Sequence, residues 1–360
     1  MKNKIITVTF LLFLFSILII NLIIPTEEIS YSERRKLAQF PELSAQNILN
    51  AQFMKEFEKY TLDQFAFRDG FRNLKASFDL KIFNKLDNNN IYVIDDSIFK
   101  MEYPFKTHNV YKVAEHMNTV YDLYLKDMNV YYSIIPDKNY FVAEQSGYLS
   151  IDYSELEKIM TENIKNMIYI DILDSLTVDD YYRTDVHWRQ ERLDRVVATI
   201  AKAMHFTEDV EDTEYTLKTY YPFYGAYYGQ SALRIDPDIL IYKTNSTIEN
   251  AIVYNYESSD AKNIISEIYN EQRLGMVDSY DIFLSGATPL MEIKNPNNEN
   301  GRELIIFRDS FASSLAPLLL EEYSEITLVD LRYVNYKTLG DFIDFKDQDV
   351  LFIYNTLLIN

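Results

Sequence analysis

The sequence predicts an α/β protein in which a mostly parallel sheet lies between two layers of helices. From Ile91 onward, short apolar runs typical of strands alternate with amphipathic stretches typical of helices. Such alternation is the pattern of βαβ units, which build parallel sheets. The composition agrees, because a chain of 360 residues with 48% hydrophobic and 15% aromatic residues has enough apolar side chains for a large core.

The amino terminus carries the features of a membrane anchor. Lys2 and Lys4 precede an apolar run from Ile5 to Ile24, and about 20 such residues span a bilayer as a helix. A cleaved signal peptide has a shorter apolar core of about 7–15 residues and a small-residue cleavage site, and neither is present. We therefore predict an uncleaved signal-anchor over residues 1–25, with cleavage as the alternative. The basic residues 34–36 offset the two lysines, so the charge count does not decide the topology.

Residues 26–90 form a helical juxtamembrane segment by pattern. Phe53, Phe57 and Tyr60 recur at spacings of three and four, which places them on one helix face. The cluster 87–90, Asp-Asn-Asn-Asn, predicts a turn that closes this segment.

The α/β domain is predicted over residues 91–360. A Tyr-rich and Asn-rich region at about 207–300 interrupts the alternation, and we interpret it as a β-rich insertion. The expected strands are 91–94, 130–135, 167–172, 304–307, 326–329 and 350–354, and the expected helices include 110–125, 151–160 and 190–203.

Composition excludes several functional classes. The net charge of -20 argues against nucleic-acid binding, which needs a basic surface to neutralise phosphates. Without cysteine, the chain has no disulfide, no thiolate nucleophile and no Cys-ligated zinc. The cluster 87–90 lacks the spaced carboxylates of a calcium loop, and one histidine near carboxylates falls short of a zinc ligand set. We expect no metal and no cofactor.

Ser310 occupies a position suited to a nucleophile. It directly follows the apolar strand 304–307 and precedes a predicted helix. Ligands of open α/β sheets bind beyond the carboxyl ends of the strands, and a helix amino terminus offers N–H groups to an oxyanion. The alternative is that Asp309 or Ser310 merely caps the helix, which is a common role for both residue types.

His187 is the candidate base. Asp185 lies two residues before it, close enough in a turn to accept a proton from one imidazole nitrogen and fix the tautomer. The other nitrogen is then free to act on Ser310, which completes the three groups of a Ser-His-Asp system. A hydrogen-bonded packing role for His187 is the alternative.

The segment Tyr182-Arg183-Thr184-Asp185-Val186-His187-Trp188, followed by a helix, resembles the signature of the bacterial DHHW family. That family is related to the SGNH-hydrolase-like domains of alginate O-acetyltransferases. Further blocks resemble the family in the same order along nearly the whole chain: Ser32–Pro41, Asp63–Asp69, Pro136–Lys138, Phe223–Tyr228, Leu304–Ala312 and Leu328–Tyr333.

The resemblance implies an SGNH-like three-layer α/β/α domain with a catalytic triad of Ser310, His187 and Asp185. Their order reverses that of ordinary SGNH hydrolases, and a triad is defined by geometry and not by chain order. Two departures stand out. Arg308 occupies the glycine position of the usual Gly-Asp-Ser block, and the glycine and asparagine of the usual oxyanion hole have no assignable counterpart.

Four further residues are predicted to contact the substrate. Lys138, after Pro-Asp at a strand end, is placed to reach the substrate or the oxyanion, with a solvated loop lysine as the alternative. Arg308 would either crowd the crevice beyond the strand ends or place a cation near an anionic sugar. Tyr227 would stack on a sugar ring, with chance placement among the 30 tyrosines as the alternative. Trp188, the only tryptophan, joins this set, with a place in the core as its alternative.

The predicted signal-anchor and the resemblance together predict a single-pass membrane protein with its main domain outside the cytoplasm. Its activity would be O-acetyl transfer to a cell-surface polysaccharide, or acetylester hydrolysis, through an acyl-serine intermediate. The expected partners are the cell-surface glycan and a membrane-bound acyl carrier protein of the O-acyltransferase type. The alternative is a catalytically inactive glycan-binding or scaffold subunit, which Arg308 and the unassigned oxyanion donors favour.

Overall fold

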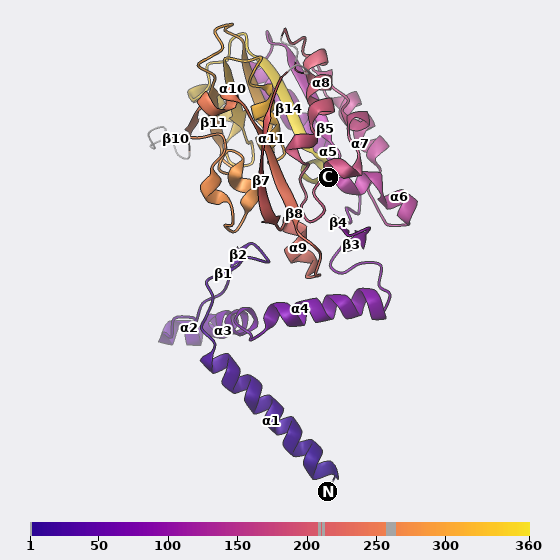
Figure 1. Ribbon diagram of the computed structural model, residues 1–360. Coiled ribbons are helices and arrows are strands. Elements are labelled where there is room, and N and C mark those ends of the chain that lie inside the picture. The colour runs from indigo at the N-terminus through magenta and orange to yellow at the C-terminus, as the bar shows by residue number, and fades with distance from the viewer. Residues whose placement is uncertain (1, 208–209, 211–212, 257–263) are drawn as a thin grey trace. The chain divides into compact units, whose positions relative to one another are not determined.

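The computed structural model describes residues 2–207, 210, 213–256 and 264–360. The chain divides into two compact units. We call residues 1–89 together with 228–235 the N-terminal unit, and residues 90–227 together with 236–360 the α/β unit. Figure 1 shows the elements of both.

The N-terminal unit begins with helix α1, Lys2–Ile23. Among the described residues, it is the one helix whose length and composition suit a membrane crossing, and a signal sequence at this end of a chain passes the same test. The elements that follow are two short paired strands, three helices and a π-helical turn: β1 Ile29–Ser30, β2 Arg35–Lys36, α2 Ala45–Leu49, α3 Gln52–Asp63, α4 Arg68–Ser77 and η1 Phe78–Ile82.

The α/β unit is built on a sheet of eight strands in the order β10-β9-β11-β13-β12-β14-β5-β6. The pairings from β13 to β6 are all parallel, whereas β11, β9 and β10 extend the sheet in antiparallel fashion. The strands are β5 Val130–Ile135, β6 Ile168–Tyr169, β9 Ile252–Asn255, β10 Ile264–Ser266, β11 Leu290–Lys294, β12 Glu303–Arg308, β13 Glu325–Val329 and β14 Asp349–Asn355.

Alternate side chains of each central strand enter different cores, which gives the unit its layers. On β12, Ile305 and Phe307 join the core that includes α5, Thr107–Tyr124, and α7, Tyr153–Asn163. Leu304 and Ile306 join the other core, with α8, Asp194–Ala203, and the stretch 311–320. The predicted three-layer α/β/α arrangement is confirmed.

The remaining elements surround this sheet or precede it. Two hairpins, β3–β4 and β7–β8, pair separately from the main sheet. Their bounds, with those of the short helices, are β3 Ile91–Ile94, β4 Ser97–Lys100, α6 Ala143–Ser146, β7 Thr216–Phe223, α9 Ala226–Ser231, β8 Asp238–Thr244, α10 Ser246–Asn250, α11 Ala312–Leu315 and α12 Thr356–Ile359.

The region 207–300, which the sequence suggests is an insertion, contributes in two ways. Its strand β11 pairs with β13 of the main sheet and β9 pairs with β11, whereas β7 and β8 form a hairpin of their own. Residues 208–209, 211–212 and 257–263 of this region lie outside the described residues.

Candidate active site

Ser310 stands at the carboxyl end of β12, next to the central strand β14. From Leu304 to Leu320, a stretch described in full, Ser310 is the one residue that is not buried. Its hydroxyl does not cap the helix, because α11 spans four residues, begins after Phe311 and has no side-chain cap. The strand-to-helix turn therefore leaves the serine side chain partly exposed. Because the helix is short, its dipole contributes little to the stabilisation of an oxyanion.

The three predicted triad residues form a continuous chain of hydrogen bonds. His187 Nε2 lies 2.8 Å from Ser310 Oγ, and His187 Nδ1 lies 2.6 Å from Asp185 Oδ1. Asp185 Oδ1 also accepts a hydrogen bond from the His187 backbone N–H, at 3.0 Å. Asp185 is fully buried, and the imidazole links it to the partly exposed serine. With Nδ1 protonated toward Asp185, Nε2 is the acceptor for the Ser310 proton.

The loop after β7 holds the second oxygen of Asp185. The Ala226 backbone N–H donates to Asp185 Oδ2 at 2.6 Å. Gly225 lies so close that a Cβ atom there would be 2.3 Å from the Asp185 Cα and Cβ atoms. A glycine at position 225 is thus required by the close approach of the two backbones.

Thr184 fastens the same turn to strand β8. Its backbone N–H and hydroxyl donate to Asp238 Oδ2 at 2.8 and 2.6 Å, and the Arg183 N–H donates to Asp238 Oδ1 at 3.0 Å. The Gly225 N–H donates to the Thr184 hydroxyl at 2.9 Å. The start of the turn that carries Asp185 is therefore held by β8 and by the loop after β7.

Aromatic rings fix the plane of the imidazole. The His187 ring stacks on Tyr280, with centroids 3.8 Å apart and planes 6° apart, and it also contacts the Phe311 ring. The Tyr280 hydroxyl donates to Ser314 Oγ at 2.9 Å. The ring that supports the base is thus bonded to the segment that follows the nucleophile.

Asp309 joins the two central strands beneath Ser310. Its Oδ1 accepts from the Phe311 N–H at 3.0 Å, and its Oδ2 accepts from the Asn355 N–H at the end of β14, at 2.7 Å. Burial raises the pKa of this carboxyl. The residue that the sequence offers as a helix cap instead shapes the turn and ties β12 to β14.

Lys138 lies inside the α/β unit and not in a solvated loop. Its Nζ donates to the carbonyl oxygens of Tyr182 and Arg183 at 2.8 and 3.1 Å. The ammonium faces the rings of Phe99 and Tyr227, with Nζ 5.2 and 5.1 Å from the ring centroids. Burial lowers its pKa to about 7. These contacts place Lys138 behind the turn that carries Asp185, and its role toward a substrate stays a prediction.

Arg308 is fully buried, so it leaves the crevice uncrowded. Its Nη1 donates to Ser313 Oγ at 2.7 Å, while Nε and Nη2 have no hydrogen-bond partner among the described residues. Burial lowers the pKa of the guanidinium. A buried cation with unpaired donors is costly, and this arginine presents no exposed face to a sugar in this structure.

Tyr227 and Trp188, the other two residues predicted to bind substrate, are also buried. The Trp188 indole donates to the Phe311 carbonyl oxygen at 3.1 Å and to Ser314 Oγ at 2.9 Å. The Tyr227 backbone N–H donates to the Thr184 carbonyl oxygen at 3.0 Å. Trp188 therefore lies in the core, which is the alternative that the sequence offers for it. Both residues support the turns around the triad.

Sequence reasoning did not identify several residues that build the site. Asp238 and Tyr280 carry no local signal, since one is among the 55 acidic residues of the chain and the other is one of 30 tyrosines. Ala226 and Gly225 had a signal, because the block 223–228 resembles a family landmark. That this block supports Asp185 becomes visible only in the folded chain.

A cleft of about 710 Å³ runs beside the segment that carries the triad turn. It is lined in part by Thr177, Asp179, Arg183, Arg189 and Arg192. Ser310 and His187 are not among its lining residues. The cleft therefore borders the site but does not contain the nucleophile.

The three-layer arrangement, with the Ser-His-Asp chain at the carboxyl end of a central strand, is an SGNH-like α/β/α fold. The chain shares this fold with a DHHW family protein from Eubacterium siraeum, at a TM-score of 0.62 and 21% identity, over 76% of this chain and 93% of that one. It is also similar to Bacillus cereus PatB1, at a TM-score of 0.59 and 16% identity, over 76% and 98% of the two chains. A PatB1 structure with a sulfonyl adduct aligns at a TM-score of 0.60 and 17% identity, over 75% and 96%.

The resemblance predicted from the sequence blocks is thus confirmed at the level of the fold. No protein-family model and no curated protein matches the chain.

Proposed function

We propose that this protein is a membrane-anchored, extracytoplasmic acyltransferase or acetylesterase that modifies a cell-surface polysaccharide through an acyl-serine intermediate. The observation that carries the proposal is the chain Asp185–His187–Ser310, whose links measure 2.6 and 2.8 Å and which ends at the one position of its strand-to-helix turn that is not buried. Such a chain activates a serine hydroxyl at neutral pH.

In the first half-reaction, Ser310 Oγ attacks the carbonyl carbon of the acyl donor while His187 Nε2 takes the hydroxyl proton. The bond between the acyl carbon and the leaving group breaks, and the imidazolium returns its proton to that group. Asp185 remains hydrogen-bonded to Nδ1 and stabilises the imidazolium charge. The product is an ester of Ser310.

In the second half-reaction, a sugar hydroxyl or a water molecule attacks the acyl-serine. His187 removes its proton and then delivers a proton to Ser310 Oγ as the ester bond breaks. A sugar acceptor makes the protein a transferase, and water makes it an esterase. The acyl donor in the transferase case would come from a membrane-bound acyl carrier protein, and helix α1 would keep this chain at the same membrane.

A sulfonyl fluoride tests the nucleophile, and the PatB1 structure with a sulfonyl adduct makes this chemistry a suitable choice. Full-length protein in detergent is treated with phenylmethylsulfonyl fluoride and digested, and the modified peptide is found by mass spectrometry. We expect a single adduct on Ser310 that is absent from His187→Ala. The matched control is Ser154→Ala, which removes an exposed serine elsewhere and should leave labelling unchanged.

Absence of any Ser310 adduct in folded wild-type protein would contradict the enzymatic proposal. It would favour the inactive glycan-binding or scaffold subunit, for which the supporting observation is Arg308 at the glycine position of the usual Gly-Asp-Ser block. Binding of the full-length protein to a glycan array would then be the next measurement.

A further inference from the structure

The N-terminal unit buries very little apolar surface for its size. Among its described residues, the buried apolar side chains are Leu37, Ala66 and Ala76. Outside α1, large apolar side chains of this unit are exposed, and they include Leu43, Leu49, Met54, Leu62, Phe65, Phe67, Phe83 and Leu86. A contiguous set of exposed apolar side chains marks an interaction surface or a membrane surface.

The clearest exposed set lies along α4 and the π-helical turn η1. Phe71, Leu74, Phe78 and Ile82 follow one another at spacings of three and four, which places them on one helix face. Their side chains are 44% to 62% exposed. We call these four residues the apolar stripe.

The opposite face of the same helix is polar and makes the internal contacts. Arg72 Nη2 donates to the Gly229 carbonyl oxygen at 2.8 Å, and Asn73 Nδ2 donates to the Ala232 carbonyl oxygen at 2.9 Å. Asp79, which is buried, pairs with Lys75 and Lys85 at 3.2 and 2.8 Å. The helix thus has its polar face inward and its apolar face outward, the reverse of a helix that faces only water.

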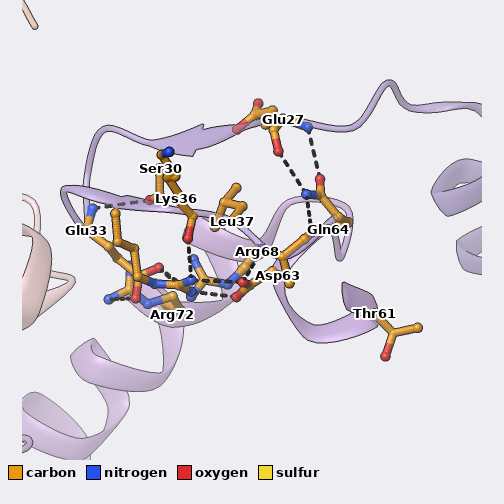
Figure 2. Close-up of polar contacts among 12 residues, drawn as sticks. Glu27, Ser30, Glu33, Lys36, Leu37, Thr61, Asp63, Gln64, Arg68 and Arg72 are labelled. Carbon is orange, nitrogen blue, oxygen red and sulfur yellow. Dashed lines mark hydrogen bonds and ion pairs between the residues drawn. The ribbon is translucent and has the colours of Figure 1, made fainter. Parts of the chain in front are cut away.

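A polar cluster fastens the end of α3 and the start of α4 to the residues that follow α1, as Figure 2 shows. Asp63 accepts two hydrogen bonds from the Arg35 guanidinium, at 2.8 and 2.5 Å, and one from the Ala38 N–H, at 2.9 Å. The Arg35 hydrogen bonds lower the pKa of Asp63 to about 2. Glu33 pairs with Arg68 and Arg72 at 2.6 and 3.3 Å.

The fastening extends to α1 itself. Asn21 Oδ1 accepts a hydrogen bond from the Ala66 N–H at 2.8 Å, two residues before α4 begins. The Gln64 side-chain amide donates to the Glu27 carbonyl oxygen at 2.8 Å and accepts from the Glu27 N–H at 3.0 Å (Figure 2). The start of the stripe-bearing helix is therefore tied directly to the end of the apolar helix.

The charge around the apolar stripe differs in sign from that of the chain. Residues 68–86 hold five basic and two acidic side chains, which gives +3, whereas the whole chain carries -20. Of these basic residues, Lys75 and Lys85 remain more than half exposed. A basic amphipathic helix with Phe and Leu on its other face is the pattern of a segment that lies in the membrane interface.

We propose that α4 and η1 lie flat in the interface of an anionic bilayer, with the apolar stripe buried among the acyl chains near the headgroups. The inference rests on the insertion of α1 into that bilayer, which belongs to the proposed function. The polar cluster then fixes the angle between the spanning helix and the interfacial helix. The protein would be held at the surface by two elements instead of one.

The chain has no cysteine, so a single introduced cysteine gives a unique label. Full-length Leu74→Cys carries an environment-sensitive fluorophore and is reconstituted into vesicles of phosphatidylcholine and phosphatidylglycerol that contain spin-labelled lipid. The matched control is Leu123→Cys on α5, since Leu74 and Leu123 are 52% and 53% exposed. Phe13→Cys reports the insertion of α1, and Phe78→Cys repeats the test at a second stripe position.

We expect spin-labelled lipid to quench the labels at positions 74 and 78 several-fold more than the label at position 123, and aqueous iodide to quench them less. Quenching at position 13 with none at 74 or 78 would overturn the interfacial helix and leave the anchor intact. No lipid quenching at any of the three would overturn both. A loss of quenching at 74 and 78 when phosphatidylglycerol is omitted would identify the anionic lipid as the charge partner.

Discussion

The two units of this chain place their apolar and polar side chains in opposite ways. In the α/β unit, apolar residues of the central strands are buried on both faces of the sheet. In the N-terminal unit, the apolar stripe is exposed, and ion pairs such as Arg35–Asp63 hold the elements together. The first is the organisation of a unit in water, and the second suits a unit that shares a boundary with lipid.

The two units also differ in what their polar groups hold in place. In the α/β unit, the buried carboxylates Asp185, Asp238 and Asp309 each accept hydrogen bonds that shape the turns around Ser310. In the N-terminal unit, the corresponding interactions of Asp63 and Glu33 hold the segment 33–38 to α3 and α4. Disrupting the first set should therefore affect chemistry, and disrupting the second should affect local stability.

The largest expected effect comes from the triad. Ser310→Ala and His187→Ala should each lower the rate of p-nitrophenyl acetate hydrolysis by about 10³-fold or more, because each removes a group required for acyl-serine formation. The double variant should lose no more than either single one. Rates are measured on full-length protein, with circular dichroism to check folding. Equal rates in all variants would contradict the acyl-serine mechanism.

Gly225→Ala should have the next largest effect. Its Cβ would overlap the Asp185 backbone, so the loop must move and the Ala226–Asp185 hydrogen bond must lengthen. We expect a loss of about 1–3 kcal/mol in the free energy of unfolding and about 10²-fold in esterase rate. The control is Gly70→Ala in α4, where an added Cβ meets nothing within 4 Å. Unchanged activity in Gly225→Ala would show that Asp185 does not depend on this loop.

Lys138→Met tests the buried ammonium behind the triad turn. The variant leaves the Tyr182 and Arg183 carbonyls without their donor, which should cost about 1–3 kcal/mol at pH 9. The pKa of Lys138 is lowered from 10.5 to about 7, so between these values the unfolded chain binds more protons than the folded one. Rising pH then stabilises the wild type through this residue.

The stability gap between wild type and Lys138→Met should accordingly widen from pH 6 to pH 9. Chemical denaturation at both pH values measures it. Lys126→Met, which removes a lysine that is 63% exposed on its side chain, should show a small gap that does not change with pH. A gap for Lys138→Met that narrows toward pH 9 would contradict the lowered pKa.

The smallest effect is expected in the N-terminal unit. Asp63→Asn weakens the pairing with Arg35, a residue that is 40% exposed, so the loss of stability should be at most about 1 kcal/mol and confined to this unit. Hydrogen exchange should show faster exchange of the Ala38 amide, with esterase activity unchanged. In wild type, the pKa of Asp63 is lowered from 3.8 to about 2, so its contribution is present above pH 3.8 and is lost as the pH falls toward 2.

Exchange at Ala38 in Asp63→Asn that is as slow as in the wild type would show that the carboxylate charge does not hold this segment in place. Reduced esterase activity in Asp63→Asn would contradict this division of roles, because the chemistry would then also depend on the N-terminal unit.

Much of the α/β fold was predictable from local pattern. The apolar run 130–135 is strand β5 at those bounds, and 304–307 lies within β12. The run 167–172 is less regular, since β6 covers two of its residues, Ile168 and Tyr169. Edge strands are short because they are paired on one side, and their sequence signal is correspondingly weak.

The sequence by itself determined the groups of the site, because Asp185 and His187 are neighbours and Ser310 follows an apolar strand. Only the tertiary structure decided the partners of each. The His187–Ser310 bond joins residues 123 positions apart, and the Ala226 and Tyr280 contacts come from segments that carry no catalytic signal. The tertiary structure also decided the burial of Lys138 and Arg308. Their charge predicts exposure, but the segments around them bury both side chains. Local pattern reports how a segment meets solvent, whereas burial and pairing depend on which distant segments fold against it.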